Sequence, residues 1–386
     1  MPGYEVFGED ERRAINELFD LNGGIVFAHG FDSLRNGIFR VREYERVFAE
    51  QFGFNYAQAL SSGTAAIRVS LEAAGVVAGD EVITQSHTYI ATVEAIMSLG
   101  ATPVIVDIND SLNMDPTCFE SAISNRTKAV IPVHMLGEMA NMEEISRIAS
   151  KNGITIIEDC AQALGAKLGD KPAGSFSLIA AYSTDAGKTI NTGEGGMVLT
   201  NLEDIYIKAR ALHDHGHTYD PSVPRGLDPA IGSGFNFRMT ELQGAIGIAQ
   251  FSKFDFIVDT QRKNKQKLME NLSGLPIKFR TNYDPMGDAG DTLVMLAEAK
   301  SSATEIVANL KTLGVGTKNL PDAMKWHFSK HWSQLVGRNE AFDSGFAGGW
   351  KTSAELLERS IAIGISLKWV DSDIDRISES IHSAWI

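Results

Sequence analysis

Short apolar segments alternate with longer helical segments through the first half of the chain, and this alternation restricts the fold more than any other feature. The predicted strands are residues 81–84, 102–107, 129–134 and 155–159. The predicted helices between and before them are residues 64–74, 88–99 and 142–152. Strands that are separated by helices of this length form βαβ units in a mostly parallel sheet. The pattern therefore predicts an α/β fold.

The length of the chain predicts a second domain. With 386 residues, 44% of them hydrophobic, the chain exceeds one ordinary domain. A long helix predicted at residues 254–272 is followed by a new α/β alternation. We therefore expect a large domain over residues 1–250 and a smaller C-terminal α/β domain over residues 251–386.

Composition narrows the classes of partner. A formal net charge of −14 is unfavourable for binding to nucleic acid or to an anionic membrane surface. No apolar run approaches membrane-spanning length, and the first 13 residues lack an apolar signal core. The two cysteines, Cys118 and Cys160, show no metal-binding spacing. We expect a cytoplasmic protein without a metal centre.

Polar residues follow several predicted strands, where open α/β sheets bind ligands. Asp159 ends a buried strand, and a carboxylate there needs a cationic partner such as a protonated pyridine nitrogen. The alternative is a structural aspartate that caps the next helix. In the segment from Ser61 to Ala66 a loop ends and a helix begins, which suits a phosphate. The alternative there is an ordinary N-cap.

Lys188 lies in a turn of small residues, five residues before Gly193-Glu-Gly-Gly. A desolvated lysine amine becomes nucleophilic and condenses with carbonyl groups. The alternative is a solvated surface lysine, which the tight glycine-rich turns disfavour. Farther along, Asn236 and Arg238 alternate with aromatic residues before a predicted helix.

In this order and spacing, these segments resemble the DegT/DnrJ/StrS family of sugar aminotransferases. The resemblance covers nearly the whole chain. It implies the aspartate-aminotransferase fold (fold type I) and pyridoxal 5'-phosphate as cofactor. The motifs that carry it are Ser62-Gly-Thr-Ala-Ala, Gly79-Asp-Glu-Val-Ile, Thr88-Tyr-Ile-Ala-Thr92, Pro132-Val-His-Met-Leu-Gly137, Glu158-Asp-Cys-Ala-Gln-Ala163, Lys188 with Gly193-Glu-Gly-Gly, His215-Gly216, and Gly234-Phe-Asn-Phe-Arg238.

The resemblance also implies residue roles. Lys188 would carry the cofactor as a Schiff base and move protons, and Asp159 would pair with the ring nitrogen. Tyr89 would stack on the ring, and Gln162 would bind beside its hydroxyl group. The phosphate would be held by Gly63, Thr64 and Ser183. Asn236 would reach the cofactor phosphate of a second subunit in a homodimer, and Arg238 would help to hold the carboxylate of the amino donor.

Some positions depart from the family pattern. Leu136 stands where an aromatic residue is usual, and Asp185-Ala-Gly187 replaces a polar-Pro-Thr sequence. We expect both departures to lie near the sugar. Relatives that remove a hydroxyl group carry histidine at the position of Lys188, so the lysine favours transamination. A non-catalytic regulatory protein would be expected to lose Lys188 or Asp159.

The substrate is predicted from three further segments. Met1-Pro-Gly-Tyr-Glu-Val-Phe-Gly8, residues 29–40 and His213-Asp-His-Gly-His217 resemble a subgroup that makes 8-amino-3,8-dideoxy-manno-octulosonate from its 8-oxo precursor with glutamate. The alternative substrate is a nucleotide-linked 3- or 4-keto-6-deoxyhexose. The candidate ligands of a sugar carboxylate are His29, Arg35, Arg40, His215 and Arg238. The alternative for Arg35 and Arg40 is a pair of structural salt bridges at a dimer interface.

Overall fold

A seven-stranded sheet forms the centre of the structure, a computed structural model that describes residues 2–220, 222–321 and 324–385. β9 runs antiparallel to both of its neighbours, and the pairings from β8 to β3 are parallel. This confirms the predicted α/β fold with a large, mostly parallel sheet. The strand order is β1 (Tyr56–Leu60), β9 (Gly196–Thr200), β8 (Ile179–Ser183), β5 (Thr155–Asp159), β4 (Thr127–Ile131), β2 (Glu81–Gln85) and β3 (Thr102–Val106).

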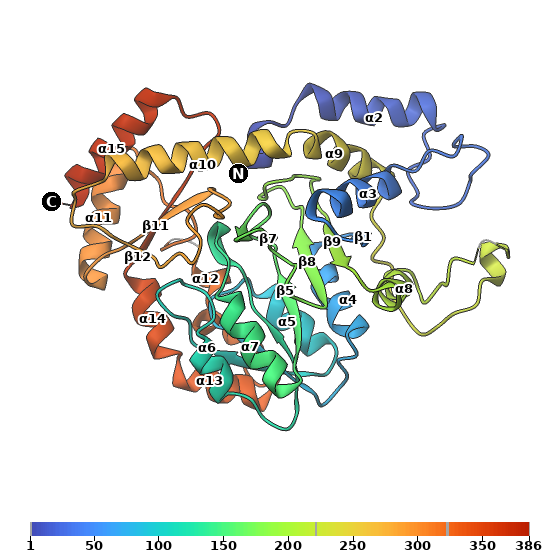
Figure 1. Ribbon diagram of the computed structural model, residues 1–386, viewed down its shortest axis with the longest axis horizontal. Coiled ribbons are helices and arrows are strands. Elements are labelled where there is room, and N and C mark those ends of the chain that lie inside the picture. The colour runs from blue at the N-terminus through green and yellow to red at the C-terminus, as the bar shows by residue number, and fades with distance from the viewer. Residues whose placement is uncertain (1, 221, 322–323, 386) are drawn as a thin grey trace.

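Both faces of this sheet are buried under helices (Figure 1). Successive residues of a strand point to opposite faces. Val82 accordingly packs into one core and Ile83 into the other. Burial on both faces explains why apolar residues stand next to each other in strands such as β4 and β8. One face carries α4 (Gly63–Ala73), α5 (Ala91–Ser98) and α8 (Glu203–Leu212), and the other carries α3 (Arg40–Phe52), α6 (Pro116–Ser121) and α7 (Met142–Asn152).

A smaller antiparallel sheet follows the long helix α10 (Phe254–Asn271). Its strands are β10 (Lys278–Phe279), β11 (Thr292–Leu296) and β12 (Ser360–Gly364), and α11 (Lys300–Thr312) and α15 (Asp371–Trp385) pack on it.

The chain between β11 and β12 does not stay with the small sheet. α13 (Glu340–Gly348) packs on β3, and Phe328 and Trp332 belong to the core of the large sheet. The indole N–H of Trp350, just before α14 (Lys351–Glu358), donates to the carbonyl of Ile105 at 2.9 Å. The division at residue 250 stays a prediction, and part of the chain beyond it covers the large sheet.

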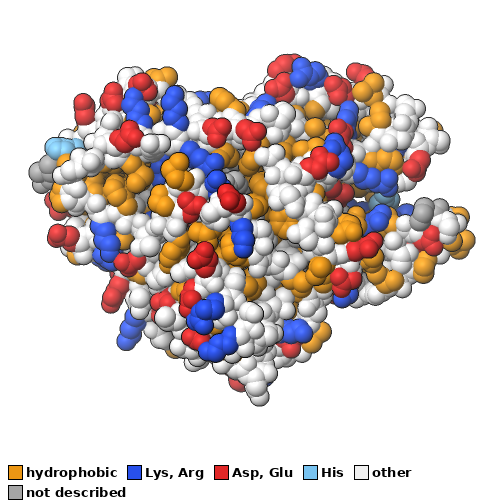
Figure 2. All heavy atoms as spheres, in the orientation of Figure 1, with side chains coloured by type: hydrophobic (Ala, Val, Ile, Leu, Met, Phe, Trp, Pro, Cys, Tyr) orange, Lys and Arg blue, Asp and Glu red, His pale blue; other side chains and the backbone are white. Residues whose placement is uncertain are grey.

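Two loops project together at one end of the molecule, at the right of Figure 1. The first, residues 22–39, follows α1 (Pro2–Glu5) and α2 (Glu9–Leu21). The second, residues 213–220 and 222–240, follows α8 and contains the short turn η2 (Arg225–Leu227). We call these two loops the arm. On the face shown in Figure 2, acidic and basic side chains are interspersed. No helix of the described residues is long and apolar enough to cross a membrane.

Candidate active site

A cavity of about 520 Å³ opens at the carboxyl ends of the parallel strands. Its walls come from the loops after β1, β2, β5 and β8, because these strands point in the same direction. The structure brings seven of the eight predicted cofactor ligands into the lining of this one cavity. They are Gly63, Thr64, Tyr89, Asp159, Gln162, Ser183 and Lys188.

The first turn of α4 forms one end of the cavity. The hydroxyl oxygen of Ser62 accepts a hydrogen bond from the N–H of Ala65 at 3.1 Å and caps the helix. A Cβ atom on Gly63 would lie 2.7 Å from the Cβ of Ser183, so only glycine lets these two loops approach. The helix dipole and the first N–H groups of α4 make this end suitable for a phosphate.

Asp159 also lines the cavity, at the residue where β5 ends. Its side chain is buried and accepts hydrogen bonds from the hydroxyl of Thr92 at 2.9 Å and the N–H of Ala161 at 3.1 Å. Burial raises the pKa of Asp159, although these two hydrogen bonds and the charge of Lys188 act against the rise. Among the described residues, no cation is in direct contact with this carboxylate, and a protonated ring nitrogen would supply one.

The amine of Lys188 faces the same cavity. Its Nζ lies 3.6 Å from Oδ2 of Asp185, which also accepts a hydrogen bond from the hydroxyl of Ser183 at 3.1 Å. Lys188 also lines an adjoining cavity of about 460 Å³, together with Gln162 and His327. Lys188 is therefore shared by the linings of two cavities.

Tyr89 presents an aromatic ring to the cavity, with 47% of the residue exposed. Its ring centroid lies 5.4 Å from that of His327. Sequence reasoning missed His327, because it comes from the segment that returns to the large sheet and no local motif marks it. The stacking role of Tyr89 remains a prediction.

Gln162 is fixed by the turn after β4. Its carbonyl accepts the N–H of Gly137 at 2.9 Å, and its Oε1 accepts the N–H of Leu136 at 3.4 Å. Leu136 itself is buried, and its side chain is not part of the cavity lining. The expectation that this departure lies near the sugar stays a prediction. Of the second departure, Asp185 and Ala186 do line the cavity.

Asn236 is the predicted cofactor ligand that the structure does not bring to the cavity of its own chain. It is exposed in the arm, where its backbone pairs with Asp214. Its role at the cofactor of a second subunit stays a prediction.

The predicted sugar ligands lie in or beside the arm and are absent from the cavity lining among the described residues. Two of them meet at buried Asp214. Arg238 donates a hydrogen bond to Asp214, and Nε2 of His29 lies 3.2 Å from it. Arg225 and Tyr219 also donate to this carboxylate, at 2.6 and 2.5 Å.

Arg35 and Arg40 make ion pairs within the chain. Arg35 is fully buried, with Nη2 3.3 Å from Glu241. Arg40 pairs with Glu17 at 3.2 Å and Glu43 at 2.8 Å. Both arginines therefore make structural ion pairs, as the alternative interpretation expects. These pairs form within one chain and not at a dimer interface. The remaining candidate, His215, is exposed in a left-handed backbone conformation with a φ of 54°.

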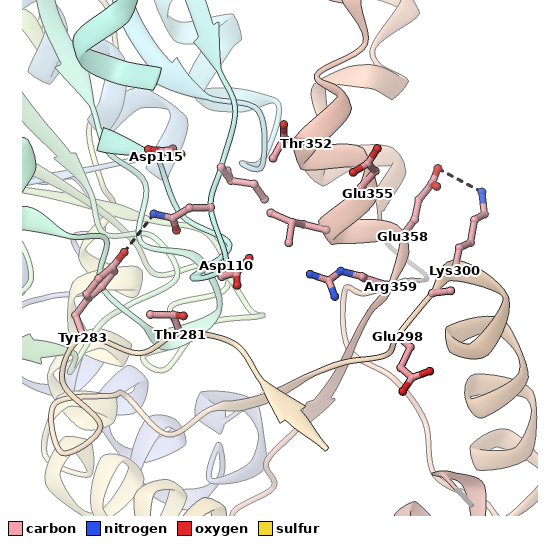
Figure 3. Close-up of a pocket in the computed structure, with 14 residues that line it drawn as sticks. Asp110, Asp115, Thr281, Tyr283, Glu298, Lys300, Thr352, Glu355, Glu358 and Arg359 are labelled. Carbon is pink, nitrogen blue, oxygen red and sulfur yellow. Dashed lines mark hydrogen bonds and ion pairs between the residues drawn. The ribbon is translucent and has the colours of Figure 1, made fainter. Parts of the chain in front are cut away.

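Another cavity, of about 750 Å³, shares no lining residue with the cavity at Lys188 (Figure 3). Its charged lining consists of the carboxylates Asp110, Asp115, Glu298, Glu355 and Glu358 and the cations Lys300 and Arg359. This excess of carboxylates disfavours a phosphate ligand, so we assign the cofactor to the cavity at Lys188.

His134, Glu158 and Cys160 have ligand atoms within 4.8 Å of one another. However, His134 and Glu158 are hydrogen-bonded to each other at 2.9 Å, and the N–H of Ala140 donates to the other ring nitrogen at 3.2 Å. The lone pairs that a metal would need are therefore used internally, and we assign no metal to this cluster.

Comparisons with known proteins agree with this geometry. Residues 32–382 match the model of the DegT/DnrJ/EryC1/StrS aminotransferase family. The chain is 42% identical, over 55% of its length, to a GDP-perosamine synthase of Caulobacter vibrioides. It is 40% identical, also over 55% of its length, to a pleiotropic regulatory protein of Geobacillus stearothermophilus. The aminotransferase of Psychrobacter cryohalolentis has a similar structure, with a TM-score of 0.86 and 26% identity over 98% of this chain and 96% of that one.

The curated relatives are matched only in part. The chain spans 56% of the length of the first and 57% of the second. The activities that their names state therefore belong to those proteins.

Proposed function

The chain belongs to the DegT/DnrJ/EryC1/StrS aminotransferase family, and on that premise we propose that it is a pyridoxal-phosphate-dependent transaminase that moves an amino group from glutamate to a keto-sugar. The observation that supports this most is the convergence of Lys188, Asp159 and the first turn of α4 on one cavity. A lysine amine, an under-partnered carboxylate and a phosphate-binding helix end are the groups that this cofactor needs.

Different residues would hold different parts of the cofactor. Gly63, Thr64 and Ser183 would hold its phosphate, and Asp159 would keep its ring nitrogen protonated. Tyr89 would cover a ring face. When bound, pyridoxal phosphate carries the amino group and supplies a ring that withdraws electrons from the carbon attached to nitrogen.

Lys188 is the residue of this site suited to moving protons. Its side chain lines the cavity, and its amine lies 3.6 Å from the carboxylate of Asp185. One site would serve glutamate and the sugar in turn, so ping-pong kinetics are expected. The direct test is a spectrum, in which purified protein should be yellow and should bleach when glutamate is added. A colourless protein that gains no colour from added pyridoxal phosphate would contradict the proposal.

Two sugar classes are candidates for the acceptor. The sequence segments at residues 1–8, 29–40 and 213–217 support the 8-oxo form of 3-deoxy-manno-octulosonate, whereas the names of relatives such as GDP-perosamine synthase support a nucleotide-linked keto-hexose. The ion pairs of Arg35 and Arg40 weaken the octulosonate argument, because neither guanidinium lies free to bind a sugar carboxylate. A panel of both substrate classes, read as amination after glutamate treatment, separates them.

We propose a homodimer with shared sites, because Asn236 is exposed in the arm and does not line the cavity of its own chain. Mixing two inactive variants, Lys188→Ala and Asn236→Ala, tests this. If Asn236 serves the neighbouring site, hybrid dimers contain one intact site and activity partly returns. No recovery after demonstrated subunit exchange would refute the shared site. The proposal places the enzyme in the cytoplasm, which cell fractionation would test.

A regulatory role is a second candidate, because one relative carries the name of a pleiotropic regulatory protein. It predicts that the cofactor binds without turnover. Lys188 and Asp159 are both in place at the cavity, which favours catalysis. Bleaching by glutamate followed by return of colour with a keto-sugar would decide for the enzyme.

A further inference from the structure

The turn after β4 has an unusual backbone. Residues Met135–Gly137 form a short helical turn in which Leu136 has a φ of 57° and Gly137 a φ of 83°. A left-handed conformation is unfavourable for leucine. At Gly137 a Cβ atom would overlap Oδ1 of Asp291. Other contacts must therefore hold this turn in place.

Arg280, just after β10, supplies such contacts. Its Nη1 donates to the carbonyl of Met135 at 2.9 Å, and its Nη2 donates to the carbonyl of Leu136 at 2.6 Å. The side chain of Arg280 is 2% exposed, so these hydrogen bonds are shielded from water. The planar fork of arginine binds two consecutive carbonyls, which lysine cannot do in the same way.

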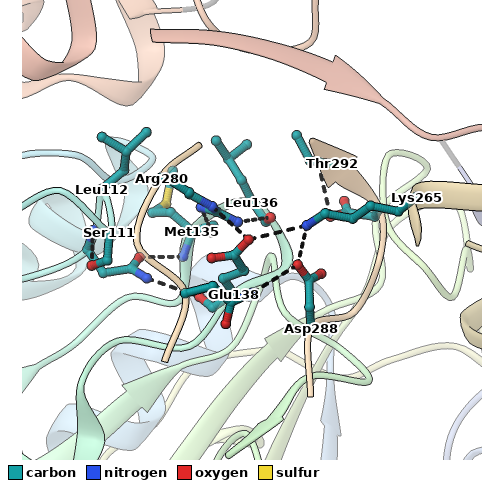
Figure 4. A network of polar contacts seen from close by, with 12 residues as sticks. Ser111, Leu112, Met135, Leu136, Glu138, Lys265, Arg280, Asp288 and Thr292 are labelled. Atoms are coloured by element: carbon teal, nitrogen blue, oxygen red, sulfur yellow. Dashed lines mark hydrogen bonds and ion pairs between the residues drawn. The ribbon is translucent and has the colours of Figure 1, made fainter. Parts of the chain in front are cut away.

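Arg280 is itself held in a buried network of charges (Figure 4). Its Nε lies 2.9 Å from Oε1 of Glu138, and Nζ of Lys265 lies 3.2 Å from the same oxygen. Lys265 also pairs with Asp288. The network of these four side chains connects α10 and the small sheet to the turn after β4.

The other side of the turn reaches the cofactor cavity. The N–H of Gly137 donates to the carbonyl of Gln162, and the N–H of Leu136 donates to its Oε1. Gln162 lines the cavity together with Asp159 and Lys188. A continuous path therefore runs from Arg280 through two residues of the turn to a cofactor ligand.

We propose that Arg280 is a positioning residue, which holds the left-handed Met135–Gly137 turn so that Gln162 is presented to the cofactor. This inference rests on the proposed function for the identity of the ligand, pyridoxal phosphate. Its structural part, that Arg280 holds the turn, is independent of any ligand.

The structural part is tested by hydrogen–deuterium exchange on the cofactor-free protein. In Arg280→Lys the charge stays but the fork is lost, and the amides of Leu136 and Gly137 should exchange about tenfold faster. Lys265→Met is the matched control, since it removes a cation from the same network without touching the turn carbonyls. Lys278 lies two positions before Arg280 and makes an exposed ion pair with Asp110. Lys278→Met therefore controls for loss of a charge in β10 that does not contact the turn. Equal exchange in Arg280→Lys and wild type, or equal acceleration in Lys265→Met, would overturn the inference.

The link to the cofactor is tested by a double-mutant cycle on the dissociation constant of pyridoxal phosphate. Gln162→Ala and Arg280→Lys should each weaken binding by about five- to tenfold. If Arg280 acts through Gln162, Arg280→Lys should have little further effect in the Gln162→Ala background. A full additional loss there, or unchanged affinity in Gln162→Ala, would refute the route through Gln162. Failure of the wild type to bind pyridoxal phosphate would refute the proposed function instead, and the exchange result would still stand.

Discussion

Asp159 and Asp214 are both buried carboxylates, yet they differ in the hydrogen-bond donors and cations that surround them. Asp214, in the arm, receives two arginines and a tyrosine. Burial alone would raise its pKa, but its donors bring the pKa well below the usual range. Asp159, in the cavity, has a hydroxyl and one N–H, and burial raises its pKa.

The difference shows which region is complete within one chain. Asp214 has its cations already, so the arm is held together by contacts of its own. Within the part of the chain that the structure describes, no cation touches Asp159, and the cavity that it lines suits a positively charged ring nitrogen. The same contrast applies to arginines and lysine. Arg35 is held at 3.3 Å from buried Glu241, whereas Lys188 lines the cavity and has only the longer 3.6 Å pair with Asp185.

Replacing the cavity lysine should give the largest effect. Lys188→Ala should lower turnover by at least about 10³-fold, because it removes both the covalent attachment and the proton carrier. Turnover is measured with glutamate and the acceptor sugar. Lys208→Ala, at a half-exposed helix position, is the control and should be unaffected. Substantial multiple turnover by Lys188→Ala would contradict the assignment.

Removing the charge of Asp159 should damage activity and spare the fold. Asp159→Asn should lower turnover by at least about 10²-fold, since a neutral amide no longer favours a protonated ring. The unfolding free energy of the cofactor-free protein should be unchanged or higher, because a charge with few partners is removed. Both quantities are measured on the same preparation. A strongly destabilised variant would mean that Asp159 has a structural partner of its own.

The matching substitution in the arm, Asp214→Asn, should lower stability. Asp214→Asn should lower the free energy of unfolding by about 3 kcal/mol, because Arg225 and Arg238 lose their common partner. Denaturant unfolding measures this loss. Stability equal to that of the wild type would show that the arm does not depend on Asp214.

The two aspartates should also respond to pH with opposite signs. The folded pKa of Asp214 lies below its ordinary value of 3.8, so its contribution to stability is present above pH 3.8 and is lost as the pH falls. The folded pKa of Asp159 is raised, so its contribution is present below pH 3.8 and is lost as the pH rises through the raised value.

Unfolding of cofactor-free wild type and of each asparagine variant across this pH range tests the signs. The stability advantage of wild type over Asp214→Asn should shrink toward low pH. The free energy of unfolding of the wild type, relative to that of Asp159→Asn, should decrease toward neutral pH. If the stability difference between wild type and each variant did not change with pH, the proposed difference between Asp159 and Asp214 would be wrong.

Arg40 should give the smallest effect. Its partners Glu17 and Glu43 are 43% and 38% exposed, and exposed ion pairs stabilise by about 0.5–1 kcal/mol at most. Arg40→Ala should therefore change the unfolding free energy little and leave both half-reactions intact. A selective loss of the sugar half-reaction would instead restore Arg40 as a sugar ligand.

The parallel part of the fold, and the gathering of polar residues at one edge of its sheet, could be predicted because both follow local rules. Apolar runs of strand length mark β2, β3 and β5, and polar residues after such strands meet at one edge of the sheet. Ser62 and Gly63 signal a helix start by their residue types. α5 begins at Ala91, later than predicted, since Thr88 and Tyr89 belong to the loop that lines the cavity.

The partners of the arm arginines could not be predicted, because they depend on contacts distant in sequence. Arg35 meets Glu241 across about 200 residues, and no local pattern announces that pair. The return of residues 324–358 to the large sheet, which brings His327 to the cavity, is likewise a matter of tertiary packing.

Borohydride reduction of the yellow protein, followed by peptide mapping, tests whether this cavity binds pyridoxal phosphate through Lys188. The reduced cofactor should be attached to Lys188, and Lys188→Ala should carry no label. Lys318 is the informative competitor, because it lines the adjoining cavity but is held by Asp291 at 2.5 Å and Thr292 at 2.8 Å. Label on Lys318 or on another lysine, with Lys188 unmodified, would show that Lys188 is not the cofactor lysine.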